Sequence, residues 1–275
     1  MKVKIITVAL AAAAVAGYAS TAGFATRTGA AEAGANNGPV AHVAARRHAV
    51  DPAVLARDAR ARARELWRAS PAYAYGEDTI GMSSWEALWC RWEGDSDEVR
   101  ACREWATGYR TEAWRLALAD HSIVDPALAK LLGERFGIER RLRHEAFADV
   151  RPALDTLRRT HALALVTNGA SCLQREKLEG SGLTEADFDA VVISGDLGVA
   201  KPSAAIFAHA LEALGVAAAE AVMVGDSLER DVRGAQAAGI RGIWLNRDGA
   251  RPAPQNGHLE VSALTELGPL LRAPV

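Results

Sequence analysis

The chain has 275 residues, of which 49% are hydrophobic and 24% charged, and its formal net charge is −2. These values are typical of a globular chain with a sizeable core, and they exclude a disordered chain, a collagen-like repeat and a polytopic membrane protein. The near-neutral balance gives no electrostatic signal for nucleic acid, so none is expected as a partner. Three cysteines, Cys90, Cys102 and Cys172, are too few and too scattered for a disulfide framework or a zinc site.

Acidic residues are almost absent from residues 1–50, where Glu32 is the only one. Lys2 and Lys4 precede an uncharged run that reaches Ala25, and a basic start, a short apolar stretch and small residues after it are typical of a secretory signal. The alternative is that Val3–Leu10, rich in β-branched residues, is a buried first strand. Residues 1–50 are therefore an atypical segment, either a degenerate first strand or signal-like. The first interpretation implies a cytoplasmic protein and the second an exported one, and the small residues of the run predict no stable membrane span.

Residues 51–149 have a helical pattern. Asp51-Pro52 and Asp125-Pro126 each combine an N-cap with proline at the first helical position. We expect helices over 53–69, from Ser83 or Ser84 through Trp92, from Ser96 to about Asp120, and from Pro126 onward. The sequence thus predicts an inserted helical module.

Six of the seven tryptophans lie in this module, and Trp85, Trp89 and Trp92 have the i, i+4, i+7 spacing of one helix face. This spacing favours the core of a helical bundle, and the alternative is an aromatic box for a ligand.

Residues 150–275 have a different texture, with short apolar runs at 162–167, 190–194, 221–225 and 242–245. Segments of helical composition lie between them, at 171–180, 203–215 and 227–239. Such alternation predicts an α/β fold, a Rossmann-like doubly wound parallel sheet covered by helices on both faces. Ligands of such sheets bind beyond the carboxyl ends of the strands.

Two of these strand ends carry residues suited to an anion. Thr167-Asn168-Gly169 combines a hydroxyl, an amide and a strand-to-helix turn whose backbone N–H groups can bind phosphate, although the same residues are common in ordinary turns. Lys201 precedes Pro202 in a loop, where it is either a phosphate-binding charge or an exposed surface lysine.

A third strand end carries two carboxylates. Asp226 follows the apolar run directly, and Asp231 follows five residues later. Two such carboxylates repel each other unless a cation or a lysine joins them, and Mg²⁺ prefers oxygen ligands of this kind. The alternative is an N-cap at Asp226 and an exposed Asp231.

In this order, Thr167-Asn168-Gly169, Lys201-Pro202 and the Gly225–Asp231 stretch resemble motifs two to four of the haloacid dehalogenase (HAD) superfamily of phosphohydrolases, in the subfamily with a helical cap. The resemblance implies a cap at 51–149 and a Rossmann-like core at 150–275. The stretches 174–177, 188–192 and 222–226 are most similar to N-acylneuraminate-phosphatase-like members.

The resemblance also implies chemistry. An aspartate at the end of the first strand forms an aspartyl-phosphate, and Mg²⁺ supports the reaction on a small phosphorylated metabolite such as a sugar phosphate. Thr167, the backbone near Asn168 and Gly169, and Lys201 would bind the phosphoryl oxygens. Asp226 would bind the metal, and Asp231 would orient the metal shell or Lys201, so Lys201, Asp226 and Asp231 are the predicted catalytic residues.

The first motif of the family, Asp-x-Asp-x-Thr, is missing. If Val3–Leu10 is the first strand, Ala9 and Ala11 occupy the positions of the two aspartates. If Thr28-Gly29-Ala30-Ala31 is instead aligned with the stretch after the motif, Ser20 and Ala22 occupy the positions of the two aspartates. Two hypotheses remain, an Mg²⁺-dependent phosphatase and a catalytically impaired relative that binds phosphate ligands or serves as a scaffold. A dehalogenase is a third, and it needs the same aspartate.

Overall fold

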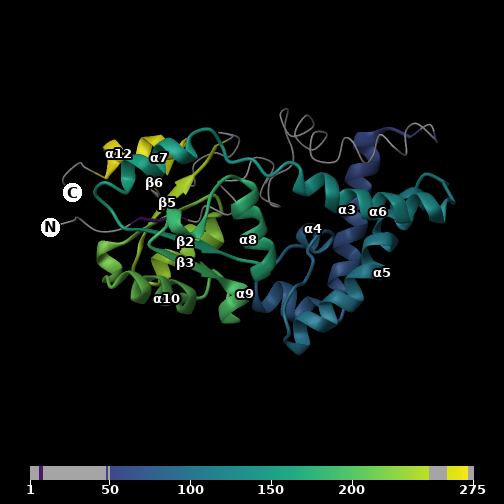
Figure 1. Ribbon diagram of the computed structural model, residues 1–275, viewed down its shortest axis with the longest axis horizontal. Coiled ribbons are helices and arrows are strands. Elements are labelled where there is room, and N and C mark those ends of the chain that lie inside the picture. The colour runs from purple at the N-terminus through teal and green to yellow at the C-terminus, as the bar shows by residue number, and fades with distance from the viewer. Residues whose placement is uncertain (1–5, 9–47, 49, 248–258, 272–275) are drawn as a thin grey trace. The chain divides into compact units, whose positions relative to one another are not determined.

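The computed structural model describes residues 6–8, 48, 50–247 and 259–271. The chain divides into two compact units, one of Met1–Gly23 with His144–Val275 and the other of Phe24–Arg143 (Figure 1). We call the first the sheet unit and the second the helical unit. No helix in the described part of the chain is long and apolar enough to cross a lipid bilayer.

The described strands of the sheet unit form one six-stranded sheet in the order β3-β2-β1-β4-β5-β6, and every pairing is parallel. This order is that of a doubly wound sheet, in which successive strands are added outward from the centre in both directions. The predicted α/β class with a parallel sheet is confirmed. The strands are β1 (Ile6–Val8), β2 (Leu163–Thr167), β3 (Ala190–Ile193), β4 (Val222–Gly225), β5 (Arg241–Leu245) and β6 (Leu259–Val261).

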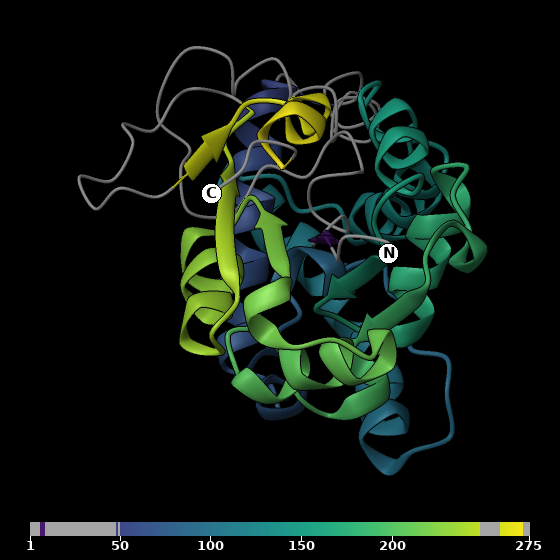
Figure 2. The ribbon, with the colours of Figure 1, turned by 90° about the vertical axis from the view of Figure 1, so that its left-hand side faces the viewer.

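The first strand lies in the middle of this sheet (Figure 2). Val8 pairs with Leu165 of β2 on one side and with Val224 of β4 on the other. The prediction of a strand within Val3–Leu10 is therefore confirmed over Ile6–Val8, and the segment has the central place that a parallel sheet needs for its backbone groups to be paired. The predicted strands at 162–167, 190–194, 221–225 and 242–245 are confirmed to within one residue at each end.

Side chains alternate between the two faces of the sheet, as the pleat of a strand requires. Leu163 and Leu165 of β2 join one apolar cluster with α7 (Val150–Leu157) and α12 (Leu267–Leu270). Val166 of β2 joins a second cluster with α10 (Ala204–Leu214) and α11 (Gly234–Ala237). Figure 1 shows α7 and α12 on one side of the strands and α10 on the other. Both faces are thus covered, which explains why β2 and β4 are buried along their whole length.

Helices follow the strands β2 and β3, as the sequence predicts. The predicted helices at 171–180 and 203–215 correspond to α8 (Ser171–Gly180) and to α10, which has Ser203 as its N-cap and Gly215 as its C-cap. A short helix, α9 (Ser194–Leu197), follows β3 directly. The segment of helical composition at 227–239 is helical as expected, but it consists of a π-helical stretch over Leu228–Arg233 followed by the short α11.

The helical unit contains α3 (Pro52–Arg68), α4 (Ser84–Ala87), α5 (Asp97–Ala119) and α6 (Pro126–Arg141), with a π-helical turn over Ala74–Thr79. The predicted starts are confirmed, because Asp51, Ser96 and Asp125 each accept a hydrogen bond from a backbone N–H in the first turn of their helix.

The predicted helix from Ser83 through Trp92 is wrong in extent, because α4 ends at Ala87. Trp92 has a φ of 55°, which a continuing right-handed helix does not allow. Side chains from elsewhere replace helical hydrogen bonds here. The carbonyls of Trp89, Cys90 and Trp92 accept from Arg141, Arg110 and Arg103, respectively.

The three tryptophans of the predicted face therefore do not share a helix, although the interpretation as core is confirmed for two of them. Trp89 and Trp92 are 1% and 0% exposed. Their place in the core depends on the irregular segment and on its arginine partners.

Helices α5 and α6 approach closely at Gly133. A Cβ atom at this position would lie 3.1 Å from the backbone oxygen of Arg110 and 3.2 Å from its carbonyl carbon. Because a backbone in a packed helix cannot move aside as a side chain can, the absence of a side chain at Gly133 sets the spacing of the two helices.

We expect Gly133→Ala to lower the free energy of unfolding by about 1–2 kcal/mol, because the overpacking outweighs the gain in helix propensity. The matched control is Gly108→Ala in α5, where a Cβ meets nothing within 4 Å. This control should raise stability by about 0.5–1 kcal/mol. Urea unfolding followed by circular dichroism measures both. Equal effects of the two variants would contradict the close approach.

Candidate functional site

The carboxyl ends of the central strands bring the predicted site residues to one edge of the sheet. Val8, Leu165 and Val224 lie opposite one another in the parallel register. Thr167 and Asp226 each follow two residues after that level in their own chains, so both lie at the carboxyl edge beside the end of β1. This edge is where open α/β sheets bind ligands.

The turn after β2 is fixed by side chains from two neighbouring segments. Thr167 is buried, and its Oγ1 donates to Oε1 of Gln174 over 3.1 Å. The backbone N–H of Gly169 donates to Oγ of Ser194 over 2.8 Å. Gln174 belongs to α8 and Ser194 begins α9, so both helices position the Thr167–Gly169 turn.

Asn168 ties this turn to the loop that carries Lys201. Its Nδ2 donates to the Lys201 carbonyl over 3.0 Å, and its Oδ1 accepts from the Lys201 backbone N–H over 2.9 Å. Two reciprocal bonds hold the amide and the lysine backbone in one orientation. Lys201 is only 8% exposed, so the alternative of an exposed surface lysine is wrong.

Lys201 and Asp231 form a buried ion pair. Lys201 Nζ lies 2.8 Å from Oδ1 of Asp231 and donates to the Val166 carbonyl over 2.8 Å. Oδ2 of Asp231 accepts from the backbone N–H of Ser227 over 2.9 Å. Each charge therefore has a partner and a further hydrogen bond, as buried charges require. The alternative of an exposed Asp231 is wrong.

Gly225 allows Asp231 to reach this position. A Cβ atom at residue 225 would lie 2.3 Å from Oδ2 of Asp231, a distance at which atoms overlap. The end of β4 must therefore be glycine for the carboxylate to pass close to the strand and meet Lys201. The Gly-Asp pair at positions 225 and 226 thus has a steric reason.

Asp226 follows β4 and is half-buried at the edge of the sheet. Its backbone carbonyl accepts from Nε1 of Trp244 in β5 over 3.1 Å, which fixes the backbone at the strand end. Ser227, and not Asp226, is the N-cap of the following π-helical stretch, so the alternative of an N-cap role for Asp226 is wrong.

A metal at this edge would have few protein side chains to bind it. The described residues contain no group of three or more His, Cys, Asp or Glu side chains arranged for a metal ion. Both oxygens of Asp231 already accept hydrogen bonds, which favours a role in holding Lys201. Mg²⁺ often takes only one or two carboxylates and keeps several waters, so Asp226 alone among these residues fits an Mg²⁺ ligand.

The structure thus joins Asn168, Lys201 and Asp231 by direct contacts and places Thr167 and Asp226 at the same sheet edge. The chemical roles of these residues stay predictions. Ala9, Ala11, Ser20 and Ala22, the positions considered for the two missing aspartates, lie outside the described residues. The sequence reasoning missed Gln174, Ser194 and Trp244, which support the site from neighbouring elements.

Fold and site together define an α/β protein with a doubly wound parallel sheet, whose predicted phosphate-binding residues lie at the carboxyl ends of neighbouring strands. A family model of haloacid dehalogenase-like hydrolases matches residues 29–239, and the chain belongs to this family.

Among its relatives, a phosphoserine phosphatase from Thermus thermophilus is 44% identical over 194 residues, which cover 70% of this chain and 75% of that protein. An N-acylneuraminate-9-phosphatase from Mus musculus is 40% identical over 137 residues, which cover 48% of this chain and 55% of that protein. The crystal structure of a 2-haloacid dehalogenase from Pseudomonas syringae pv. tomato matches with a TM-score of 0.55 and 25% identity over 98% of both chains. The predicted resemblance, including that to N-acylneuraminate phosphatases, is confirmed.

We expect the Lys201–Asp231 pair to show strong energetic coupling. Lys201→Met and Asp231→Asn each leave a buried charge without its partner, so each should lower the free energy of unfolding by about 3–5 kcal/mol. The double variant should lose less than the sum of the two, by about 2 kcal/mol or more.

Urea unfolding of the four proteins measures this coupling. The control cycle uses Arg233→Gln and Glu229→Gln, an exposed i, i+4 pair at 2.8 Å, for which coupling should be at most about 0.5 kcal/mol. Similar coupling in the two cycles would show that burial does not strengthen the Lys201–Asp231 interaction.

Proposed function

We propose that the chain is an Mg²⁺-dependent phosphohydrolase of a small phosphorylated metabolite. The buried Lys201–Asp231 pair carries this proposal, because it fixes a positive charge at the sheet edge where ligands bind. Phosphoryl transfer depends mainly on positioning and on neutralising the charge of the transferred group. Lys201 is held in position by Asp231 and by the Val166 carbonyl, and its charge would neutralise part of the phosphoryl charge.

Lys201 retains capacity for a ligand in this arrangement. An ammonium group has three N–H donors, and Asp231 and Val166 accept from two of them. Within the described part of the chain no acceptor binds the third N–H, which would donate to a phosphoryl oxygen. The Thr167 hydroxyl and the backbone N–H groups of the turn at Asn168 and Gly169 would bind the other oxygens.

Asp226 would hold Mg²⁺, and the ion when bound would neutralise phosphoryl charge and orient the oxygens. Trp244 contributes by fixing the Asp226 backbone from β5. Asp231 serves as the positioning residue of Lys201. The helical unit would act as a cap that selects the substrate and excludes water during the reaction.

The substrate class follows from the relatives. They are named as a phosphoserine phosphatase and an N-acylneuraminate-9-phosphatase, and both names describe small phosphorylated metabolites. We extend this class to the chain and expect one of these compounds, or a similar small phosphate ester, as the substrate.

A second candidate function is a catalytically impaired relative that binds a phosphate ligand without hydrolysing it. The observation that favours it is the sequence after the central strand β1. No Asp or Glu occurs between Val8 and Glu32, although the family mechanism uses an aspartate directly after the first strand. Loss of a nucleophile can lower kcat by about 10⁶, as measured in the protease subtilisin.

An assay with p-nitrophenyl phosphate, phosphoserine and N-acylneuraminate 9-phosphate separates the two functions. A phosphatase should turn over at least one of them, and chelation of Mg²⁺ or Asp226→Asn should abolish turnover because the metal is lost. A binding module should show no turnover and should bind inorganic phosphate in calorimetry, with the binding event at this sheet edge lost in Lys201→Met. Absence of both turnover and phosphate binding would contradict both functions.

Restoring the two carboxylates tests whether their absence limits activity. We expect Ala9→Asp/Ala11→Asp to raise the rate of phosphoester hydrolysis by about 10³-fold or more, because the first alignment puts these positions directly after the β1 strand. The matched control, Ser20→Asp/Ala22→Asp, follows the second alignment and should leave the rate unchanged. A gain only in the control would show that the second alignment is the correct one.

A further inference from the structure

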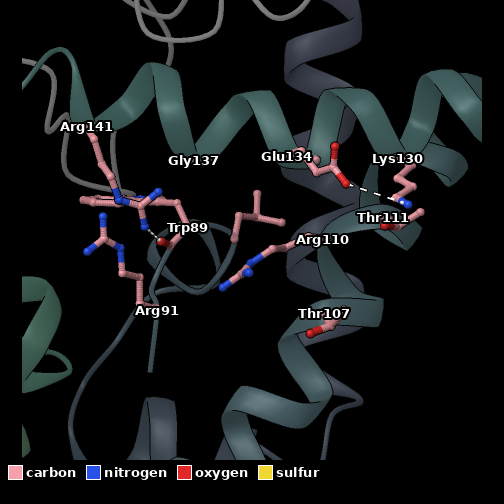
Figure 3. A pocket seen from close by; sticks show the side chains of 11 residues that line it. Trp89, Arg91, Thr107, Arg110, Thr111, Lys130, Glu134, Gly137 and Arg141 are labelled. Carbon is pink, nitrogen blue, oxygen red and sulfur yellow. Dashed lines mark hydrogen bonds and ion pairs between the residues drawn. The ribbon is translucent and has the colours of Figure 1, made fainter. Parts of the chain in front are cut away.

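A pocket of about 280 Å³ lies within the helical unit (Figure 3). Residues of α5, of α6 and of the irregular segment after α4 line it, so one unit supplies the whole pocket. The charged and aromatic side chains that line it are Trp89, Arg91, Arg110, Lys130, Glu134 and Arg141.

The charges around this pocket are unequal. Four side chains are positive, and Glu134 is the one carboxylate among the described residues that line it. Glu134 also lies 4.0 Å from Lys130 Nζ in an exposed ion pair, shown in Figure 3, so it is directed to the lysine. The pocket therefore carries a net positive charge that would attract an anion.

Arg110 has the environment of a binding residue. One of its terminal nitrogens donates to the Cys90 carbonyl, and its buried Nε has no hydrogen-bond acceptor within the described part of the chain. Burial is the main cause that lowers the pKa of Arg110, nearby Cys90 raises it, and the positive charge of Arg141 lowers it by a smaller amount. An anion between the two guanidinium groups would offset both the burial and the repulsion between the two charges.

Arg141 is held in place at the end of α6. One of its terminal nitrogens donates to the Trp89 carbonyl over 2.6 Å, and its guanidinium lies 5.9 Å from the centre of the Trp89 ring. Figure 3 shows the side chains of Arg110 and Arg141 extending from their helices toward the Trp89 segment. Their position is thus fixed before any ligand binds, which lowers the entropic cost of binding.

We propose that this pocket binds a small metabolite through its phosphate or carboxylate group, with Arg110 and Arg141 as the anion-binding residues. Guanidinium groups match the geometry of both oxyanions. Its volume of about 280 Å³ is close to the smallest volumes usual for ligand pockets, which fits a small molecule. The residues of this pocket all belong to the helical unit, whereas those of the Lys201 site belong to the sheet unit.

Charge variants of two exposed residues on α6 test the proposal with opposite signs. Binding of inorganic phosphate and of malonate to the full chain is measured by calorimetry. Glu134→Gln should lower the dissociation constant of the pocket for the anion by about threefold, because it removes a negative charge. Lys130→Gln should raise it by about threefold, because it removes a positive one. Neither residue is buried, so neither change should impair folding.

Arg110→Gln should weaken anion binding by the pocket by about tenfold or more, because it removes a charged donor from the anion. The control is Arg115→Gln, on the same helix, whose side chain pairs with Glu112 outside the pocket. It should leave binding unchanged. Unfolding midpoints show whether Arg110→Gln weakens binding only by destabilising the segment around Cys90. If it does, Glu134→Gln and Lys130→Gln decide whether the pocket binds the anion.

Binding of phosphate alone or of malonate alone, with these charge effects, supports the site and identifies its oxyanion. The proposal is overturned if neither probe binds, if Glu134→Gln and Lys130→Gln change affinity equally, or if the only binding phase responds to Lys201→Met and not to the pocket variants. Turnover does not enter this test, so the absence of phosphatase activity would leave its result unaffected.

Discussion

The ion pair between Lys201 and Asp231 determines how the candidate site is assembled. It joins the loop before α10 to the segment after β4, and its ammonium also reaches the Val166 carbonyl of β2. Gly225 provides the space for the carboxylate, and Asn168 fixes the backbone of the lysine. Two buried charges are stable only because each has an opposite charge and a further hydrogen bond. The residues around the pair therefore all contribute to keeping these two charges paired. The same arrangement fixes the Lys201 ammonium at the carboxyl edge of the sheet.

Much of the fold could be predicted because its signals are local. Asp51-Pro52 and Asp125-Pro126 mark helix starts by themselves, and apolar runs ending in glycine or polar residues mark the buried strands. The extent of α4 could not be predicted in this way. The carbonyls just after α4 accept hydrogen bonds from Arg103, Arg110 and Arg141. These arginines lie 11 to 52 residues away in the chain, and no local pattern shows such partners.

In the candidate site too, residues with a local sequence signal could be predicted and residues that act through long-range contacts could not. Thr167, Lys201, Asp226 and Asp231 stand out because polar residues after apolar strands are informative. Gln174, Ser194 and Trp244 act through hydrogen bonds across 7, 25 and 18 residues. A glutamine in a helix and a tryptophan in a strand have ordinary explanations, so sequence alone does not single them out. The pocket between α5 and α6 depends on tertiary packing in the same way.

The central position of β1 has a consequence for the order of events during synthesis. Val8 is made early, but its partners Leu165 and Val224 follow 157 and 216 residues later, after the whole of α3 to α6. The helical unit can thus fold on the nascent chain while the sheet still lacks its later strands. Pairing across such separations makes closure of the sheet slow, because long loops must close before the strand Ile6–Val8 gains its two partners.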